Sequence, residues 1–118
     1  MNLDKIDNIF FIGIGGIGMS SIAQFFHDKG NIVFGYDQNN NRAIEILINK
    51  GIGVTNKLNL EEIPEDIMGD DLEIVYTPAI KKDNIFLNYF LLISSINRNV
   101  PFLLHRELLF MNSFIFFT

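Results

Sequence analysis

The stretch NIFFIGIGGIGMSS, residues 8–21, decides the fold of this chain. Its apolar run, Ile9 to Ile12, predicts a buried β-strand that enters a glycine-rich turn. The apolar spacing that follows predicts a helix, whose inner face would carry Ile17, Ile22, Phe25 and Phe26. Strand, glycine turn and helix in this order favour a phosphate site, because free N–H groups and the positive end of the dipole meet at a helix N-terminus.

The glycines of this turn match a dinucleotide-binding spacing. Gly13, Gly15 and Gly18 fit G-x-G-x-x-G, and Asp37 follows Gly18 by 19 residues at the end of the next predicted strand. That separation is close to the ~20 residues expected for an acid that meets a ribose. The pattern therefore favours a nucleotide ligand, although a tight strand-to-helix turn without any ligand remains an alternative.

Composition excludes several classes of protein. The 118 residues are 48% hydrophobic and contain no cysteine, which argues against disorder, a disulfide framework and a thiol nucleophile. The polar start MNLDKIDN is unlike a signal peptide, and no apolar run approaches the ~20 residues of a membrane span. A net charge of −5 lacks the basic footprint of nucleic-acid binding. We expect a soluble cytoplasmic protein without nucleic-acid or membrane partners.

The rest of the chain alternates predicted strands and helices. Strands are expected at 32–36, 53–55, 72–76, 100–104 and 114–117, helices at 42–50 and 84–97, and short helical turns at 58–68 and 105–111. This alternation predicts an α/β fold, a Rossmann-like doubly wound parallel sheet in a single domain. The glycine turn, Asp37 and residues 77–80 all follow strands, so we expect them to meet at the carboxyl edge of the sheet.

Other candidate site residues have weaker support from the sequence. The acids Glu61, Glu62, Glu65 and Asp66 are better explained by a solvated face than by a metal site. His27 is expected at the surface, and His105, after a predicted strand, could contact a ligand. A histidine-based metal site is improbable.

Four strings in order carry a more specific resemblance. They are FIGIGGIGMSSIA (11–23), GYD (35–37), TPAI (77–80) and VPFLLHRELL (100–109). Together they resemble the N-terminal, UDP-binding domain of UDP-N-acetylmuramate–L-alanine ligases, which belong to the Mur ligase family of bacterial peptidoglycan (cell-wall) synthesis. The resemblance implies an ATP-dependent ligase that joins L-alanine to UDP-N-acetylmuramate through an acyl-phosphate.

The resemblance also implies a binding site. Backbone N–H groups of Gly15, Gly16, Ile17, Gly18 and Met19 would hold the diphosphate, with Ser20 nearby. Asp37 would meet the uridine ring or ribose, and Thr77, Ala79 and Ile80 would line the nucleotide site. Arg106 would reach a phosphate or the lactyl carboxylate, or would form a structural pair.

Domain limits follow from the same resemblance. Residues 1–113 would be the UDP-sugar-binding domain, and residues 114–118 would begin the first strand of a missing central ATPase domain. No G-K-S or G-K-T occurs in the chain. ATP and Mg²⁺ would therefore bind only in that central domain, so we expect no cofactor, metal or catalytic residue here and no ligase activity from these residues alone.

Three alternatives remain open from the sequence. The same glycine pattern fits a nicotinamide-binding domain of a dehydrogenase or a nucleotide-sensing module, although neither explains Gly16 or residues 77–80. A decayed copy that binds nothing is the second. The third is a ligase that reloads muropeptides onto recycled precursor, whose N-terminal domain is similar.

Overall fold

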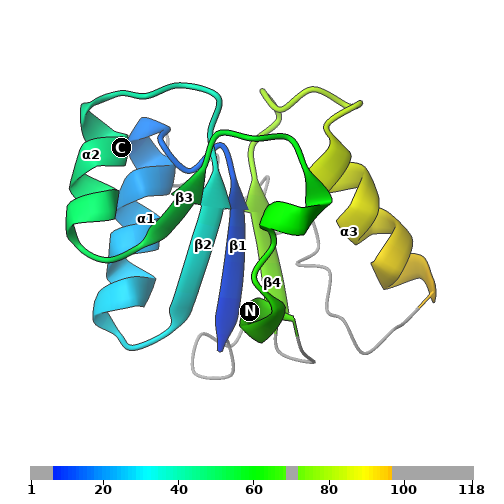
Figure 1. Cartoon of the computed structure of the whole chain (residues 1–118), viewed down its shortest axis with the longest axis horizontal. Helices are drawn as coiled ribbons and strands as arrows, with labels where there is room; N and C mark the ends of the chain where they lie inside the picture. Colours follow the sequence, from blue (N-terminus) through cyan, green and yellow to red (C-terminus); the bar gives the residue numbers. More distant parts are fainter. Residues whose placement is uncertain (1–6, 69–71, 97–118) are drawn as a thin grey trace.

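The computed structural model describes residues 7–68 and 72–96 of the chain. Four parallel strands form one sheet in the order β3-β2-β1-β4 (Figure 1). The strands are β1 (Asn8–Ile12), β2 (Ile32–Tyr36), β3 (Gly53–Thr55) and β4 (Leu72–Tyr76). The helices are α1 (Ile17–Asp28), α2 (Arg42–Asn49) and α3 (Ile85–Ile96), and two 3₁₀ turns, Leu60–Glu62 and Glu65–Ile67, precede β4.

The predicted fold class is confirmed. Every expected strand and helix up to residue 96 is present, and the region 58–68 forms short turns interrupted by Pro64. The strands expected at 100–104 and 114–117, the turn at 105–111, and both His105 and Arg106 lie outside the described residues.

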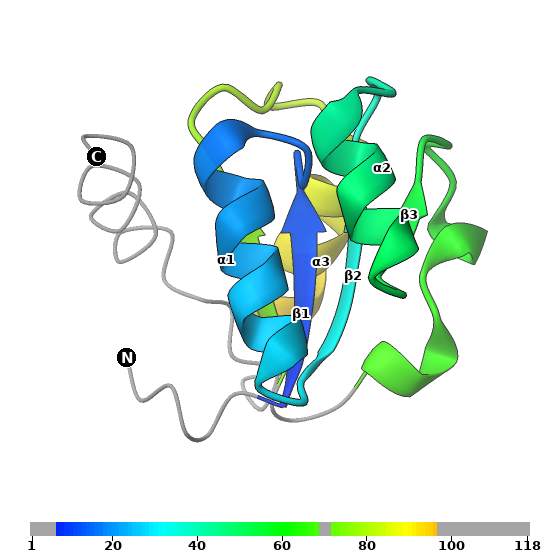
Figure 2. The same ribbon diagram turned by 90° about the vertical axis from the view of Figure 1, so that its left-hand side faces the viewer.

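The sheet is covered on both faces, which gives three layers. Helices α1 and α2 lie on one face and α3 lies on the other (Figure 2). Strand β1 is central, paired in parallel with β2 and β4. Because side chains alternate along a strand, Ile9 and Phe11 pack toward α1 and α2, while Phe10 and Ile12 pack toward α3.

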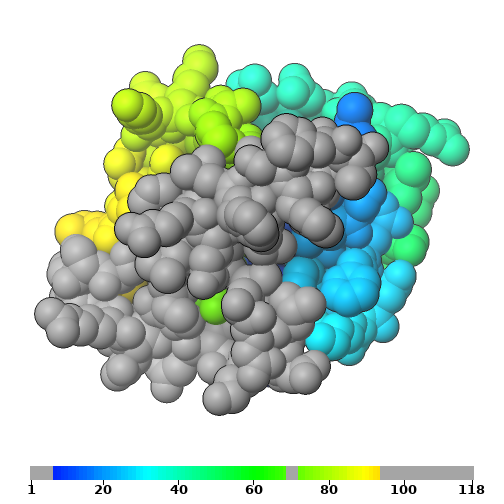
Figure 3. All heavy atoms as spheres, turned by 180° about the vertical axis from the view of Figure 1, so that it is seen from behind, coloured from blue at the N-terminus to red at the C-terminus, as the bar shows by residue number. Residues whose placement is uncertain are grey.

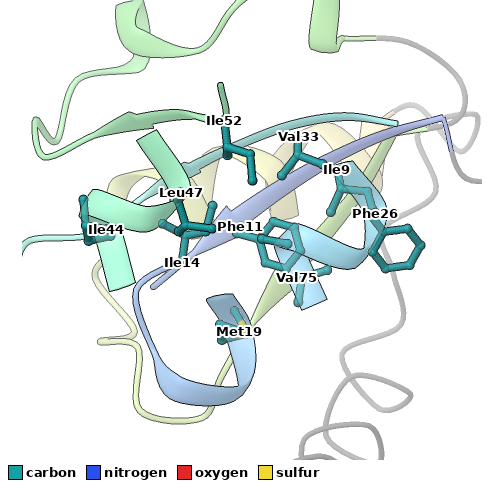
Figure 4. Packing of buried hydrophobic residues seen from close by; sticks show 11 residues of the cluster. Ile9, Phe11, Ile14, Met19, Phe26, Val33, Ile44, Leu47, Ile52 and Val75 are labelled. Atoms are coloured by element: carbon teal, nitrogen blue, oxygen red, sulfur yellow. The ribbon is translucent and has the colours of Figure 1, made fainter. Parts of the chain in front are cut away.

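The core between the sheet and helices α1 and α2 includes a residue of the glycine turn itself. Ile14 is fully buried among side chains from β1, α1 and α2 (Figure 4). A Cβ at Gly35 of β2 would lie 2.5 Å from the Ile14 Cδ1 atom, so glycine at this position makes room for the turn to pack on the strand. The turn is thereby part of the core instead of a surface loop.

Local signals end the first two helices where the sequence predicts. Gly30 follows α1 with φ +98° and Gly51 follows α2 with φ +91°, the left-handed conformation common after helix ends. At their starts, Asn41 accepts a hydrogen bond from the Ile44 amide of α2, and Asn84 accepts hydrogen bonds from the Phe86 and Leu87 amides of α3.

The predicted inner face of α1 is partly wrong. Ile17 is 91% exposed and Phe25 is 53% exposed, whereas Met19, Ala23 and Phe26 are buried against the sheet. The buried stripe follows positions 19, 23 and 26, and Ile22 lies at its border. Packing of the whole helix selects this stripe, because several apolar faces are available in so hydrophobic a segment.

Candidate functional site

The glycine turn after β1 is tied to the end of β2. The amides of Gly13 and Ile14 both donate to the Tyr36 carbonyl oxygen, at 2.7 and 3.0 Å. The Asp37 amide in turn donates to the Thr55 carbonyl oxygen at 3.1 Å. These bonds hold the carboxyl ends of β1, β2 and β3 at one edge of the sheet.

Asp37 is buried at this edge and uses both carboxylate oxygens. Its Oδ2 accepts from the Gly15 amide at 2.8 Å, and its Oδ1 accepts from the Asn39 amide at 2.9 Å. The residue is only 8% exposed. The carboxylate therefore joins the glycine turn to the loop after β2.

The start of α1 has its N–H groups available. Gly16 is the residue before the helix, makes no side-chain cap, and no acidic residue occupies the first turn. The first hydrogen bond of the helix runs from the Ser20 amide to the Gly16 carbonyl oxygen, at 2.8 Å. The amides of Ile17, Gly18 and Met19 come before it, so they have no carbonyl partner within the helix. This contrasts with α2 and α3, whose first amides donate to Asn41 and Asn84.

A cavity of about 520 Å³ opens at the same edge. Residues after β1, β2, β3 and β4 line it, and Figure 3 shows the segments after β2 (cyan to teal) and β4 (yellow-green) at one end of the molecule. Its lining consists of Gly13, Gly15, Gly16, Tyr36, Asp37, Gln38, Asn39, Asn41, Leu58, Thr77, Ala79, Ile80, Lys81, Asp83 and Asn84. This volume is within the range of ordinary small-molecule sites, ~300–1,000 Å³.

The expected meeting of three separate segments at one edge is confirmed. Six of the residues predicted from the sequence line the cavity: Gly15, Gly16, Asp37, Thr77, Ala79 and Ile80. The other described ones, Ile17, Gly18, Met19 and Ser20, form the first turn of α1 and are not in its lining. Their roles toward a ligand stay predictions.

Two of the expected diphosphate donors are already engaged. The Gly15 amide donates to Asp37, and the Gly16 amide donates to the Gly13 carbonyl oxygen at 3.2 Å. Ser20 is 7% exposed, and its hydroxyl donates to the Ile17 carbonyl oxygen at 3.2 Å. The structure thus narrows the available donors to the amides of Ile17, Gly18 and Met19.

Sequence reasoning missed several lining residues. Leu58 follows β3, and Lys81, Asp83 and Asn84 lie between β4 and α3. The rule that strand ends converge could have found Leu58, but the reach of the later loop depends on where α3 packs.

Tyr36 is a further lining residue that the sequence did not single out. Burial, and then the negative charge of Asp37, raise the pKa of the Tyr36 phenol, so it stays protonated at neutral pH and can donate a hydrogen bond.

Within residues 7–68 and 72–96, no group of three or more His, Asp or Glu side chains is arranged to hold a metal ion. None of the helices in this part of the chain has the length and apolar character needed to cross a membrane.

Comparison with known proteins names the family. The model of the Mur ligase family, catalytic domain, matches residues 8–103. The chain belongs to the Mur ligase family.

Curated Mur ligases share much of this sequence. The UDP-N-acetylmuramate–L-alanine ligase of Flavobacterium psychrophilum is 42% identical over 91 residues, which are 77% of this chain and 20% of that protein. The same enzyme of Porphyromonas gingivalis is 47% identical over 83 residues, covering 70% of this chain and 18% of that protein. The chain spans about one fifth of the length of these relatives.

Solved Mur ligase structures share the fold. UDP-N-acetylmuramate–alanine ligase of Thermotoga maritima matches with a TM-score of 0.62 and 27% identity, over 77% of this chain and 19% of that one. UDP-N-acetylmuramate:L-alanyl-gamma-D-glutamyl-meso-diaminopimelate ligase of Neisseria meningitides matches with a TM-score of 0.63 and 22% identity, over 75% and 27% of the two chains. The second likeness concerns the fold alone.

Proposed function

We propose that this chain binds the UDP moiety of UDP-N-acetylmuramate, as part of an ATP-dependent ligase that adds L-alanine to it in peptidoglycan synthesis. The diphosphate lies at the N-terminus of α1, and the nucleoside extends into the cavity past Asp37 and residues 77–80. Similarity to curated alanine-adding ligases, at 42% and 47% identity, supports the choice of substrate.

The uncapped start of α1 is the observation that carries this proposal. Its amides and dipole attract an anion, no carboxylate occupies the first turn, and the 520 Å³ cavity opens beside Gly16. Because the chain belongs to the Mur ligase family, we choose a UDP-sugar as the ligand over the nicotinamide dinucleotide of the alternative hypothesis.

The remaining parts of the reaction belong elsewhere in the whole protein. We propose that ATP and Mg²⁺ bind outside these 118 residues, because the sequence has no G-K-S or G-K-T. We retain residues 1–113 as the UDP-sugar-binding domain and 114–118 as the beginning of the ATPase domain. The cytoplasmic location, the role of Arg106 and the absence of ligase activity from this segment alone stay predictions.

Calorimetric titration of the 118-residue chain tests the proposed ligand. We expect UDP-N-acetylmuramate and UDP to bind, uridine to bind more weakly because it lacks the diphosphate, and NADH to bind more weakly still. At 100-fold excess over Kd, a ligand should stabilise the fold by about 2.7 kcal/mol in thermal unfolding. Tighter binding of NADH would contradict the proposal, and no binding of any nucleotide would favour a decayed copy.

A further inference from the structure

Asp37 is held by three hydrogen bonds, two to its carboxylate and one from its backbone amide. Its two carboxylate oxygens accept from the amides of Gly15 and Asn39, at 2.8 and 2.9 Å, while its own amide donates to Thr55 of β3. The residue is only 8% exposed. Asp37 is therefore built into the junction between the ends of β1, β2 and β3.

Glycine at position 15 is explained by the same contact. A Cβ there would lie 2.8 Å from the Asp37 Oδ2 atom and 2.7 Å from the Ile44 Cδ1 atom. Gly15 is not among the glycines with positive φ, so its backbone conformation alone does not demand glycine. The close approach of the carboxylate and of Ile44 demands it.

This contact fixes the geometry of the turn that delivers the start of α1. Ile17, the first residue of the helix, is only two positions beyond Gly15. A turn held by a charge-assisted hydrogen bond presents the following amides in one arrangement, which reduces the ordering cost when a ligand binds.

We propose that Asp37 is a positioning residue: it locks the glycine turn so that the amides of Ile17, Gly18 and Met19 face the diphosphate. This inference rests on the proposed function and revises the expectation that Asp37 serves mainly through the ribose or the uridine ring. The carboxylate acts on the ligand through the turn, and the Gly15 amide is its partner instead of a phosphate donor.

A paired comparison of variants and ligands tests this role. Asp37→Asn keeps the size of the side chain but replaces one acceptor by an NH₂ donor, which would face an amide donor. We expect it to weaken binding of UDP and of 2′,3′-dideoxyuridine diphosphate by the same factor, roughly tenfold or more, since hydrogen bonds to charged groups are the strong ones. Asp66→Asn, the same acid-to-amide change at an exposed residue that does not line the cavity, is the matched control and should change neither affinity.

A loss confined to UDP would overturn the proposal, because it would place the carboxylate on the ribose hydroxyls. If Asp37→Asn changed the affinity for neither ligand, the proposal would also be overturned. The two-ligand design separates a direct contact with the ribose hydroxyls from positioning, in the manner of a double-mutant cycle.

A measurement on the unmodified chain keeps the test independent of variant folding and of ligand. By NMR, the Gly15 amide should be protected from hydrogen exchange and should show coupling through the hydrogen bond to the Asp37 carboxyl carbon. A rapidly exchanging Gly15 amide without that coupling would refute the positioning role. If the chain binds no nucleotide but the coupling is present, the proposed function fails while the Asp37–Gly15 lock stands.

Discussion

At the scale of single residues, the described lining of the cavity has one basic and two acidic side chains. Lys81 is the basic side chain among the described residues that line it, where Asp37 and Asp83 are the acidic ones. The neighbouring Lys82 is also exposed but does not line the cavity. Lys81 is therefore the lining side chain whose charge would attract an anionic ligand, while we expect the backbone amides of α1 to be its principal hydrogen-bond donors.

Replacing Lys81 by alanine tests where the charge of the ligand lies. We expect Lys81→Ala to weaken UDP binding by about two- to fivefold, because an exposed charge contributes up to about 1 kcal/mol. The loss should shrink in high salt, since screening weakens exposed charge interactions. Calorimetric titration at two ionic strengths measures it.

Lys82→Ala is the matched control, because it removes the same charge one residue away. Equal effects of the two variants would mean that only net charge matters. Uridine, which carries no phosphate, should bind the Lys81→Ala protein as it binds the unmodified chain.

At the scale of elements, the three helices differ in how they begin. Asparagine side chains cap α2 and α3, whereas α1 begins after Gly16 with no side-chain cap. The Gly16 backbone, at φ −64° and ψ 154°, is one that any residue can adopt, and a Cβ there would lie 3.5 Å from its nearest neighbours. Stability alone would therefore permit a capping residue, and we attribute the glycine to ligand approach.

Gly16→Ser separates stability from binding. The serine hydroxyl should cap the Gly18 or Met19 amide, so thermal unfolding should show unchanged or slightly higher stability, by a few tenths of a kcal/mol. UDP affinity should fall, because the same amides are expected to hold the diphosphate. Calorimetry and thermal unfolding of one preparation give both values.

Asn59→Ser, which exchanges one good cap for another at the turn Leu60–Glu62, should leave binding nearly unchanged, because Asn59 does not line the cavity. Unaltered UDP affinity in the Gly16→Ser protein would place the ligand away from the start of α1.

At the scale of the whole molecule, a cluster of aromatic rings joins the sheet to α3. Phe10 of β1 is fully buried, and its ring centroid lies 5.7 Å from Phe34, 5.2 Å from Phe86 and 5.0 Å from Phe90. Side chains of β1 therefore contribute to two hydrophobic cores, one between the sheet and α3 and the other between the sheet and helices α1 and α2. The glycine turn begins where this strand, buried on both faces, ends.

Phe10→Ala should destabilise the chain by about 3–5 kcal/mol, through lost burial and the cavity left between sheet and helix. Phe25→Ala is the control, because its ring is 53% exposed, and it should cost no more than about 1 kcal/mol. Denaturant unfolding followed by circular dichroism measures both. Similar losses in the two proteins would contradict the layered core described above.

Local patterns allowed much of this molecule to be predicted. Short-range propensity and backbone restrictions account for the limits of β2, β3 and β4, the glycines after α1 and α2, and the turn interrupted by Pro64. The rule that parallel strands end at one edge then predicted that the glycine turn, Asp37 and residues 77–80 would meet.

The sequence by itself determined the order of elements, the parallel sheet and the edge at which a site forms, because these depend on near neighbours and on simple chain topology. Only the tertiary structure decided that Asp37 binds the Gly15 amide, that Met19 is buried while Ile17 is exposed, and that Leu58 and Lys81 reach the cavity. Those features depend on how elements distant in sequence pack together, which spacing along the chain does not specify.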